Sequence, residues 1–148
     1  MVRSIEGKHA GYYEAILQLR NVSEEIKEFA AKEIEQAGIY IAKTEVMKNG
    51  YDLYLGDSKF AKIIGTKLQH KFGGEYAVSP SLFSHKDGRN IYRLTILFRS
   101  APFKKGDLVR YKGEDYTVKV VAKEIILLNL QTGKRKHLKY KEMVHIKV

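Results

Sequence analysis

The hydrophobic pattern of the first hundred residues alternates between the period of a strand and the period of a helix. Apolar and polar residues alternate over residues 12–20, which predicts a strand with one buried face. Apolar residues then recur at helical spacing over residues 26–37, and Asn21 stands three residues before Glu24, a capping-box spacing that predicts the start of this helix. A second stripe of this kind over residues 60–72 predicts a second amphipathic helix.

Four further strands are predicted in the same part of the chain. They cover, in order, residues 39–47, 51–55, 76–83 and 91–99. Asn49-Gly50 suits a tight turn between the first two, and residues 84–90 are expected to form a polar loop between the last two. The order strand, helix, strand, strand, helix, strand, strand predicts an α+β sandwich with both helices on one face of the sheet.

The last third of the chain has the pattern of a small all-β unit. Its five predicted strands cover residues 106–111, 116–122, 125–130, 135–138 and 144–148. Five short strands favour a small β-barrel, with a Src-homology-3-like barrel as the first choice and an oligonucleotide-binding barrel as the second. Pro102 lies in a turn-rich stretch, so we expect an α+β domain over residues 1–100 and a small basic β-barrel domain over residues 101–148.

Composition narrows the classes of function. The 148 residues are 44% hydrophobic and 30% charged, which is typical of a folded globular chain. The absence of cysteine excludes disulfides, thiolate catalysis and thiolate zinc sites. No apolar stretch approaches the roughly 18 residues of a membrane span, and the first residues lack a signal-peptide pattern. We therefore expect a monomeric cytoplasmic protein without a membrane partner.

The distribution of charge indicates the partner. The chain has a formal net charge of +10, which favours phosphate-rich partners. Residues 101–148 hold twelve Lys and Arg against five Asp and Glu, a net charge of +7. RNA contact is predicted for the basic residues of this part, namely Lys104, Lys105, Arg110, Lys112, Lys134, Arg135, Lys136, Lys139 and Lys141. A solvated edge that discourages strand addition would have the same composition, and charge alone leaves both interpretations open.

The face of the predicted first sheet that the helices leave uncovered carries a second set of candidate RNA-binding residues. It is expected to carry Tyr12, Gln18, Arg20, Arg93 and Arg99, together with Thr95. An aromatic and basic mixture of this kind can stack bases or hold phosphates, although a solvated sheet face can look the same. The signatures of the RNA-recognition and KH modules are both absent from the sequence.

No catalytic motif is visible in the sequence. The five histidines stand apart from one another, and the zinc-protease, nucleophile-elbow and phosphate-loop motifs are missing. His85 and Asp87 could form an acid–base pair, but the polarity of their loop explains both residues. We therefore expect no enzyme activity, no metal and no cofactor.

Several sequence blocks follow one another in an order that is typical of a known family. They are YYEAILQLR at residues 12–20, GYDLYL at 50–55 followed by Lys59, Ala61 and Leu68, YRLT at 92–95 and PFKKGDLV at 102–109. In this order they resemble the Nmd-three family, the adaptors for export of large ribosomal subunits in eukaryotes, over almost the whole chain. Members begin with a cysteine-rich zinc domain, so we expect this cysteine-free chain to correspond to their central and C-terminal region.

The resemblance implies a non-catalytic factor that docks on the large ribosomal subunit. It would contact ribosomal RNA and ribosomal proteins on the intersubunit, tRNA-site side, and oppose premature subunit joining alongside other maturation factors. The Lys-rich, Asn- and Gln-poor composition suits an archaeal or thermophilic source. In an archaeal cell, which has no nucleus, the role would be subunit maturation, quality control or translation instead of export. The family blocks nominate Arg20, the hairpin around Gly50 and the segment 104–110 of this chain.

Other classes of function stay open at this point. The chain could be an RNA-processing accessory that only delivers substrate, or a general basic RNA-binding module. If its basic faces bind nothing, it would be a plain protein-interaction module. Salt-sensitive RNA binding separates the RNA-binding classes from the last one.

Overall fold

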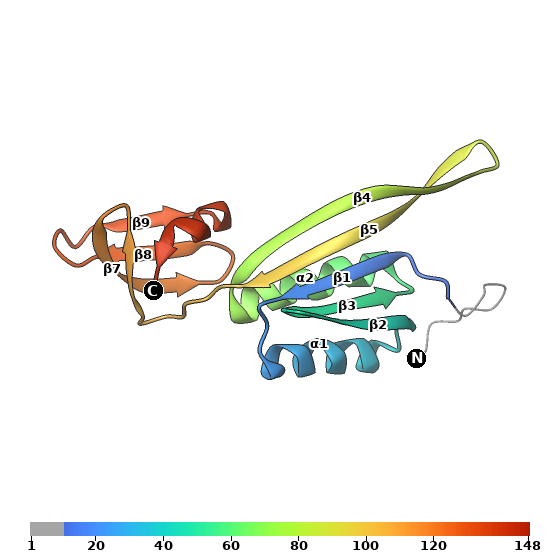
Figure 1. Ribbon diagram of the computed structural model, residues 1–148, viewed down its shortest axis with the longest axis horizontal. Coiled ribbons are helices and arrows are strands. Elements are labelled where there is room, and N and C mark those ends of the chain that lie inside the picture. Colours follow the sequence, from blue (N-terminus) through green and yellow to red (C-terminus); the bar gives the residue numbers. More distant parts are fainter. Residues whose placement is uncertain (1–10) are drawn as a thin grey trace.

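The computed structural model describes residues 11–148, apart from the side chains of residues 82–86 and 89–91. The elements of its first part are β1 (Ala15–Arg20), α1 (Glu24–Ala37), β2 (Ile41–Met47), β3 (Gly50–Leu55), α2 (Ser58–Phe72), β4 (Gly74–Lys86) and β5 (Arg89–Ser100). The predicted order of strands and helices in this part is therefore confirmed (Figure 1).

Both helices begin at a side chain that caps their first turn. The hydroxyl of Ser23 accepts a hydrogen bond from Ile26 N at 3.3 Å, so the expectation that Asn21 caps α1 is wrong. Asn21 has a φ of 55° and forms the tight turn that leads from β1 into the cap. Asp57 caps α2 in the same way as Ser23 caps α1.

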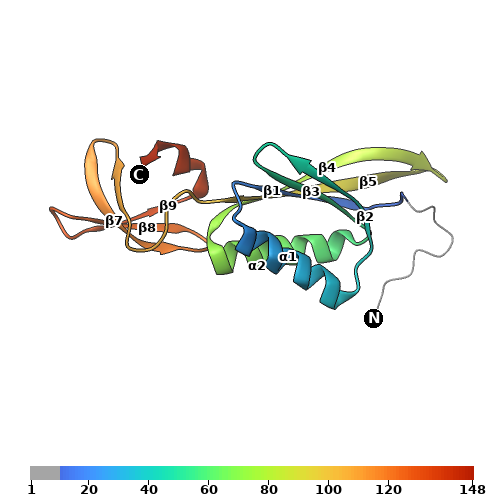
Figure 2. The same ribbon diagram turned by 60° about the horizontal axis from the view of Figure 1, so that its bottom comes forward.

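The first sheet is mixed and carries both helices on one face. Its strand order is β2-β3-β1-β5-β4, with β1 parallel to β5 and antiparallel to β3. Figure 2 shows α1 and α2 on the same side of this sheet, as predicted. Leu17, Leu19, Ile96 and Phe98 are fully buried in the core that the helices cover. The even-numbered residues of β1 therefore lie on the opposite face.

Strands β4 and β5 form a hairpin that is longer than predicted. The polar loop expected over residues 84–90 is wrong, because pairing continues to Lys86 and Arg89 on either side of a two-residue turn. Asp87 and Gly88 have φ values of 52° and 75°, which is the backbone of a type I′ turn. Strand β1 pairs with β5 only from Leu94 onward, so the outer part of the hairpin is two-stranded and projects beyond the sheet (Figure 1).

The second part of the chain forms an antiparallel sheet. Its elements are β6 (Leu108–Tyr111), β7 (Glu114–Val121), β8 (Ile125–Asn129), β9 (Arg135–Leu138), the 3₁₀ helix η1 (Tyr140–His145) and β10 (Ile146–Lys147). The strand order is β10-β6-β7-β8-β9, and every neighbouring pair is antiparallel. The five predicted strands are confirmed, whereas η1 was not predicted.

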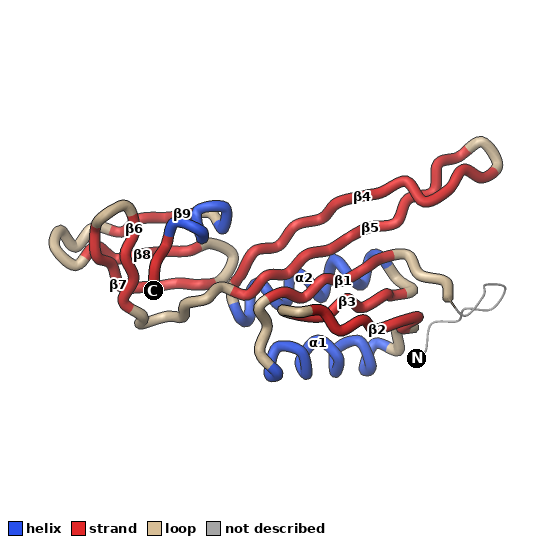
Figure 3. Tube along the Cα trace, viewed as in Figure 1, coloured by secondary structure: helices blue, strands red, loops and turns tan. Residues whose placement is uncertain are grey.

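The prediction of a closed barrel, of either type, is wrong. Strands β9 and β10 are the two edges of the second sheet, and no pairing joins them in the part of the chain that the structure describes. Strand β10 has only two residues, and η1 occupies the chain between the two edges (Figure 3). Tyr140 and Met143 of η1 are buried in the core of this sheet, so a helix covers it where strand pairing was expected.

The two sheets have separate hydrophobic cores that meet at the end of α2. The first core reaches Phe98 and the second begins at Phe103. Ala101 N donates a hydrogen bond to Gly73 O at 3.3 Å. The backbone of Gly73 lies against Val121, where a Cβ would collide with that residue. The division into domains at residue 101 stays a prediction.

None of the helices in residues 11–148 combines the length and the hydrophobicity that crossing a lipid bilayer requires.

Candidate nucleic-acid interface

The uncovered face of the first sheet contains most of one predicted set of contact residues. The pairing of β1 with β5 places Gln18 beside Leu97 and Arg20 beside Arg99. These four residues lie on the face of the sheet opposite the helices. Arg93 lies on the same side of β5 by strand alternation, and Tyr12 precedes β1. The structure therefore gathers these residues along the two central strands.

Two of the predicted arginines of this face, Arg20 and Arg99, are engaged with carboxylates of neighbouring strands. Arg20 Nη2 lies 2.8 Å from Asp52 Oδ1, and its guanidinium also donates to the carbonyls of Leu19 and Tyr51. Arg99 Nε lies 3.5 Å from Glu75 Oε1. These pairs remove much of the field that the arginines would otherwise offer to a phosphate.

A third charge cluster occupies the β2–β3 edge of the same face. Tyr54 Oη donates to Glu45 Oε1 at 2.5 Å, and Lys43 Nζ lies 3.2 Å from the same oxygen. The hydrogen bond from Tyr54, followed by that from Lys43, lowers the pKa of Glu45. The same hydrogen bond is the main cause that raises the pKa of Tyr54 to about 12. This cluster is therefore also balanced in charge.

Aromatic rings cover the end of this face near the start of β1. The Arg93 guanidinium carbon lies 3.7 Å from the centre of the Tyr13 ring, and Arg93 Nε donates to Tyr13 O at 3.1 Å. Tyr13 in turn packs edge-on against Tyr54, with ring centres 4.8 Å apart. Tyr12 Oη donates to Glu14 Oε2 at 2.7 Å. Two of the predicted contact residues, Arg93 and Tyr12, are therefore engaged with Tyr13 and Glu14, which were not predicted.

A basic hollow lies at the end of the second sheet, beside the β8–β9 loop. Figure 1 shows this loop at the end of the sheet farthest from the first sheet. The hollow has a volume of about 290 Å³ and is lined by Glu114, Tyr116, Asn129, Thr132, Lys134, Arg135 and Lys136. Three consecutive predicted RNA-binding residues thus share one concave site.

Tyr111 lies beneath two of the predicted cations, one of which, Lys136, also lines the hollow. Lys112 Nζ is 5.3 Å and Lys136 Nζ is 5.7 Å from the centre of its ring. Lys112 belongs to the β6–β7 turn and Lys136 to β9, so the curvature of the sheet brings cations from both sides over one aromatic ring. The ring itself is 2% exposed and cannot stack on a base from solvent.

The side chain of Asn129 holds the β8–β9 loop, which carries Lys134 and leads into Arg135 and Lys136 of β9. Its Oδ1 accepts hydrogen bonds from Gln131 N at 2.8 Å and Thr132 N at 3.0 Å. Asn129 O accepts from Gly133 N, and Thr132 Oγ1 accepts from Lys134 N. The basic loop is therefore organised before any ligand arrives, which reduces the entropy lost on binding.

The remaining predicted cations are not part of the hollow. Lys104 and Lys105 precede β6, and Lys139 and Lys141 lie just after β9, at the other end of the sheet from Asn129. Arg110 lies on β6, where it donates to Gly113 O and lies 3.5 Å from Asp115 Oδ1. Within residues 101–148, all of which are described, Arg110 is the sole Lys or Arg in an ion pair.

A comparison with protein-family models matches residues 12–99 to the model described as NMD3, second domain. The chain belongs to the Nmd-three family. Proteins of this family are non-catalytic adaptors that associate with the large ribosomal subunit. No curated protein sequence matches the chain.

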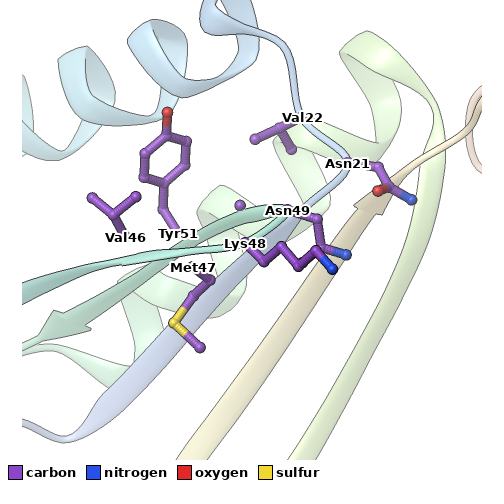
Figure 4. Close-up of a pocket in the computed structure, with 8 residues that line it drawn as sticks. Asn21, Val22, Val46, Met47, Lys48, Asn49 and Tyr51 are labelled. Carbon is purple, nitrogen blue, oxygen red and sulfur yellow. The ribbon is translucent and has the colours of Figure 1, made fainter.

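The Nmd-three match includes the hairpin around Gly50, where the structure contains a second hollow. It has a volume of about 300 Å³ and lies between the β2–β3 turn and the start of α1. Figure 4 shows Val46 and Tyr51 on the side of the hairpin that faces α1. Val46 is 79% exposed, and Tyr51 Oη donates to Glu24 Oε1 at 3.1 Å. Gly50 is required for packing, because a Cβ there would collide with Leu19 O.

The basic hollow lies outside the residues that the Nmd-three model matches. The charge pattern of the sequence indicates the three cations of this hollow but not Glu114, Tyr116 and Asn129, which shape it. Asn129 precedes a Thr-Gly turn, which is a local signal for an Asn side chain that caps a loop. Glu114 and Asn129 come together only through the pairing of β7 with β8, which no local pattern reveals.

Proposed function

We propose that this chain docks on the intersubunit side of the large ribosomal subunit and that its second sheet supplies the contacts to ribosomal RNA phosphates. The role is non-catalytic and belongs to subunit maturation, quality control or translation. Membership of the Nmd-three family supports the choice of partner. The location of the RNA contact rests on charge, which differs sharply between the two sheets.

One observation carries the proposal. The cations on the open face of the first sheet are engaged within the protein, whereas Lys134, Arg135 and Lys136 converge on a hollow without forming an ion pair. Cations without an ion-pair partner, on an ordered loop and the strand that follows it, attract phosphate without first breaking an ion pair. The first sheet then acts as a scaffold whose exposed face meets ribosomal proteins or other maturation factors.

The alternative is a general basic RNA-binding module. This alternative is favoured because the residues that line the hollow all follow residue 99, whereas the family model matches residues 12–99. In that case the chain would bind any RNA with similar affinity, and the specificity for the large subunit would come from elsewhere.

Co-sedimentation with purified large and small ribosomal subunits, across a salt series and with excess competitor RNA, tests the proposal. The test variant is Lys134→Glu with Arg135→Glu and Lys136→Glu. The control is Lys32→Glu with Lys59→Glu and Lys62→Glu, which changes the net charge equally at exposed positions of α1 and α2.

We expect the wild type to be retained on the large subunit and the test variant to bind weakly. Each lost phosphate contact reduces the slope of log affinity against log salt by about 0.7 to 0.9, so three contacts reduce it by about 2 to 3. The control variant should keep most of both affinity and slope. An equal slope in wild type and test variant would refute the assigned RNA contact, and complete loss to competitor RNA would favour the general module.

A further inference from the structure

The basic hollow of the second sheet contains one carboxylate, that of Glu114, among its three cations. Opposite charges this close together normally pair, yet Glu114 forms no ion pair with Lys134, Arg135 or Lys136 in the described structure. The cations therefore stay available to an anion, and the carboxylate must be held by something else.

Two neutral side chains hold the carboxylate. Glu114 Oε2 accepts a hydrogen bond from Tyr116 Oη at 2.9 Å and another from Asn129 Nδ2 at 3.4 Å. Tyr116 is 4% and Asn129 is 8% exposed, so both donors are fixed in the protein. Burial, followed by the bond to Glu114, raises the pKa of Tyr116, which therefore stays a donor at neutral pH.

The second carboxylate oxygen, Oε1 of Glu114, accepts no hydrogen bond from the described residues. The hollow thus offers two kinds of group to a ligand, cations for an anion and a fixed acceptor for a hydroxyl proton. Its volume of about 290 Å³ is at the lower end of the roughly 300 to 1,000 Å³ of ligand sites, so it admits one sugar-phosphate unit. Because the rings of Tyr111 and Tyr116 are buried, it has no platform on which a base could stack.

We propose that this hollow is a subsite for one ribose-phosphate unit of single-stranded RNA. Lys134, Arg135 and Lys136 bind the phosphate, and Glu114 Oε1 accepts a hydrogen bond from the 2′-hydroxyl. The hollow recognises the RNA backbone without regard to base sequence and rejects DNA. In DNA the carboxylate would face a phosphodiester with no hydroxyl to bind, so only the like-charge repulsion would remain. The inference rests on the proposed function in that RNA is the partner of the second sheet.

Short labelled oligonucleotides test the inference on the full chain without the ribosome. Fluorescence anisotropy at low salt compares oligouridine with two matched oligomers, one of deoxyuridine and one of 2′-O-methyluridine, which keeps the oxygen but lacks the donor. A hydrogen bond to a charged acceptor changes affinity by about tenfold or more. We expect RNA to bind about tenfold more tightly than either of the other two.

The variant Glu114→Gln tests the role of the Glu114 carboxylate as a hydrogen-bond acceptor. The amide oxygen of Gln can keep both bonds to Tyr116 and Asn129, which leaves an NH₂ donor where Oε1 stood. The variant should therefore bind DNA more tightly and lose the preference for RNA. Glu124→Gln is the matched control, because Glu124 is exposed in the turn between β7 and β8, outside the hollow. It should leave the ratio of RNA to DNA affinity unchanged.

Three outcomes would overturn the inference. One is equal binding of RNA and DNA by the wild type, and another is an RNA preference that survives in Glu114→Gln. The third is binding of neither oligomer by a chain that still co-sediments with the large subunit, which would keep the proposed function and remove only this subsite. An RNA preference in a chain that fails to co-sediment would keep the subsite and remove the ribosomal role.

Discussion

Substitution of Arg20 tests whether this residue stabilises the first sheet or contacts the ribosome. The family blocks nominate this residue as functional, yet its guanidinium lies 2.8 Å from Asp52 Oδ1 and donates to two carbonyls. The side chains of Arg20 and Asp52 are 14% and 10% exposed. Replacing Arg20 by Met would therefore leave a buried carboxylate without its cation.

The expected loss of stability is large. Breaking a buried ion pair by removing one partner costs about 3 to 5 kcal/mol, which is a substantial part of the roughly 5 to 15 kcal/mol of a typical protein. For a chain of this size that loss lowers the melting temperature by about 10 °C. Replacing both residues, Arg20→Met with Asp52→Leu, removes the unpaired charge and should restore stability to within about 1 kcal/mol.

Thermal unfolding followed by circular dichroism measures these changes, and hydrogen exchange of the β1 amides locates them in the first sheet. Co-sedimentation of the double variant with large subunits then asks whether Arg20 also contacts the ribosome. Our reasoning is refuted if the single variant is as stable as the wild type or if the double variant is no more stable than the single. A stable double variant that no longer binds the subunit would show that Arg20 is a contact residue.

Three further predictions concern the first sheet. In Gly65→Ala the new Cβ would lie 2.6 Å from Tyr76 Cε1, and overpacking of about 1 to 3 kcal/mol should outweigh the gain in helix propensity and lower the melting temperature. In Tyr54→Phe the pKa of Glu45 should rise toward its ordinary 4.5 in an NMR titration. Because the native pKa of Glu45 is lowered, its stabilising effect is present above pH 4.5 and is lost as the pH falls, and the variant, in which only Lys43 still lowers this pKa, should show a smaller loss. Replacing residues 83–90 by Asn-Gly should change the melting temperature by less than about 3 °C, since a two-stranded ribbon contributes little stability alone.

The local pattern of the sequence predicted most elements of the fold because their causes are local. The alternation over β1 appears in the structure as buried Ala15, Leu17 and Leu19 with half-buried residues between them. Gly38 ends α1 in the left-handed conformation that glycine adopts without strain. One local error concerned the cap of α1, where both Asn21 and Ser23 are suitable residues and only the backbone decides between them.

The missed features depend on contacts between distant residues. Polar composition suggested a loop over residues 84–90, whereas the Asp87-Gly88 turn lets the hairpin continue through them. Barrel closure depends on whether two edge strands meet, and η1 takes the place of that pairing. Glu114 belongs to the hollow because β7 pairs with β8, a relation that strand patterns alone do not fix.

The pairing of charges decides which cations can bind RNA. Fifteen of the 27 Lys and Arg lie in the first hundred residues, so a simple count would divide RNA binding between the two sheets. On the open face of the first sheet, however, Asp52, Glu75 and Glu45 lie beside Arg20, Arg99 and Lys43, and each pair cancels most of its field beyond a Debye length of about 8 Å. In the second sheet Lys134, Arg135 and Lys136 form no ion pair and outnumber the one carboxylate of their hollow, that of Glu114. The salt dependence of RNA binding should therefore follow the charge of the second sheet, although more than half of the basic residues lie outside it.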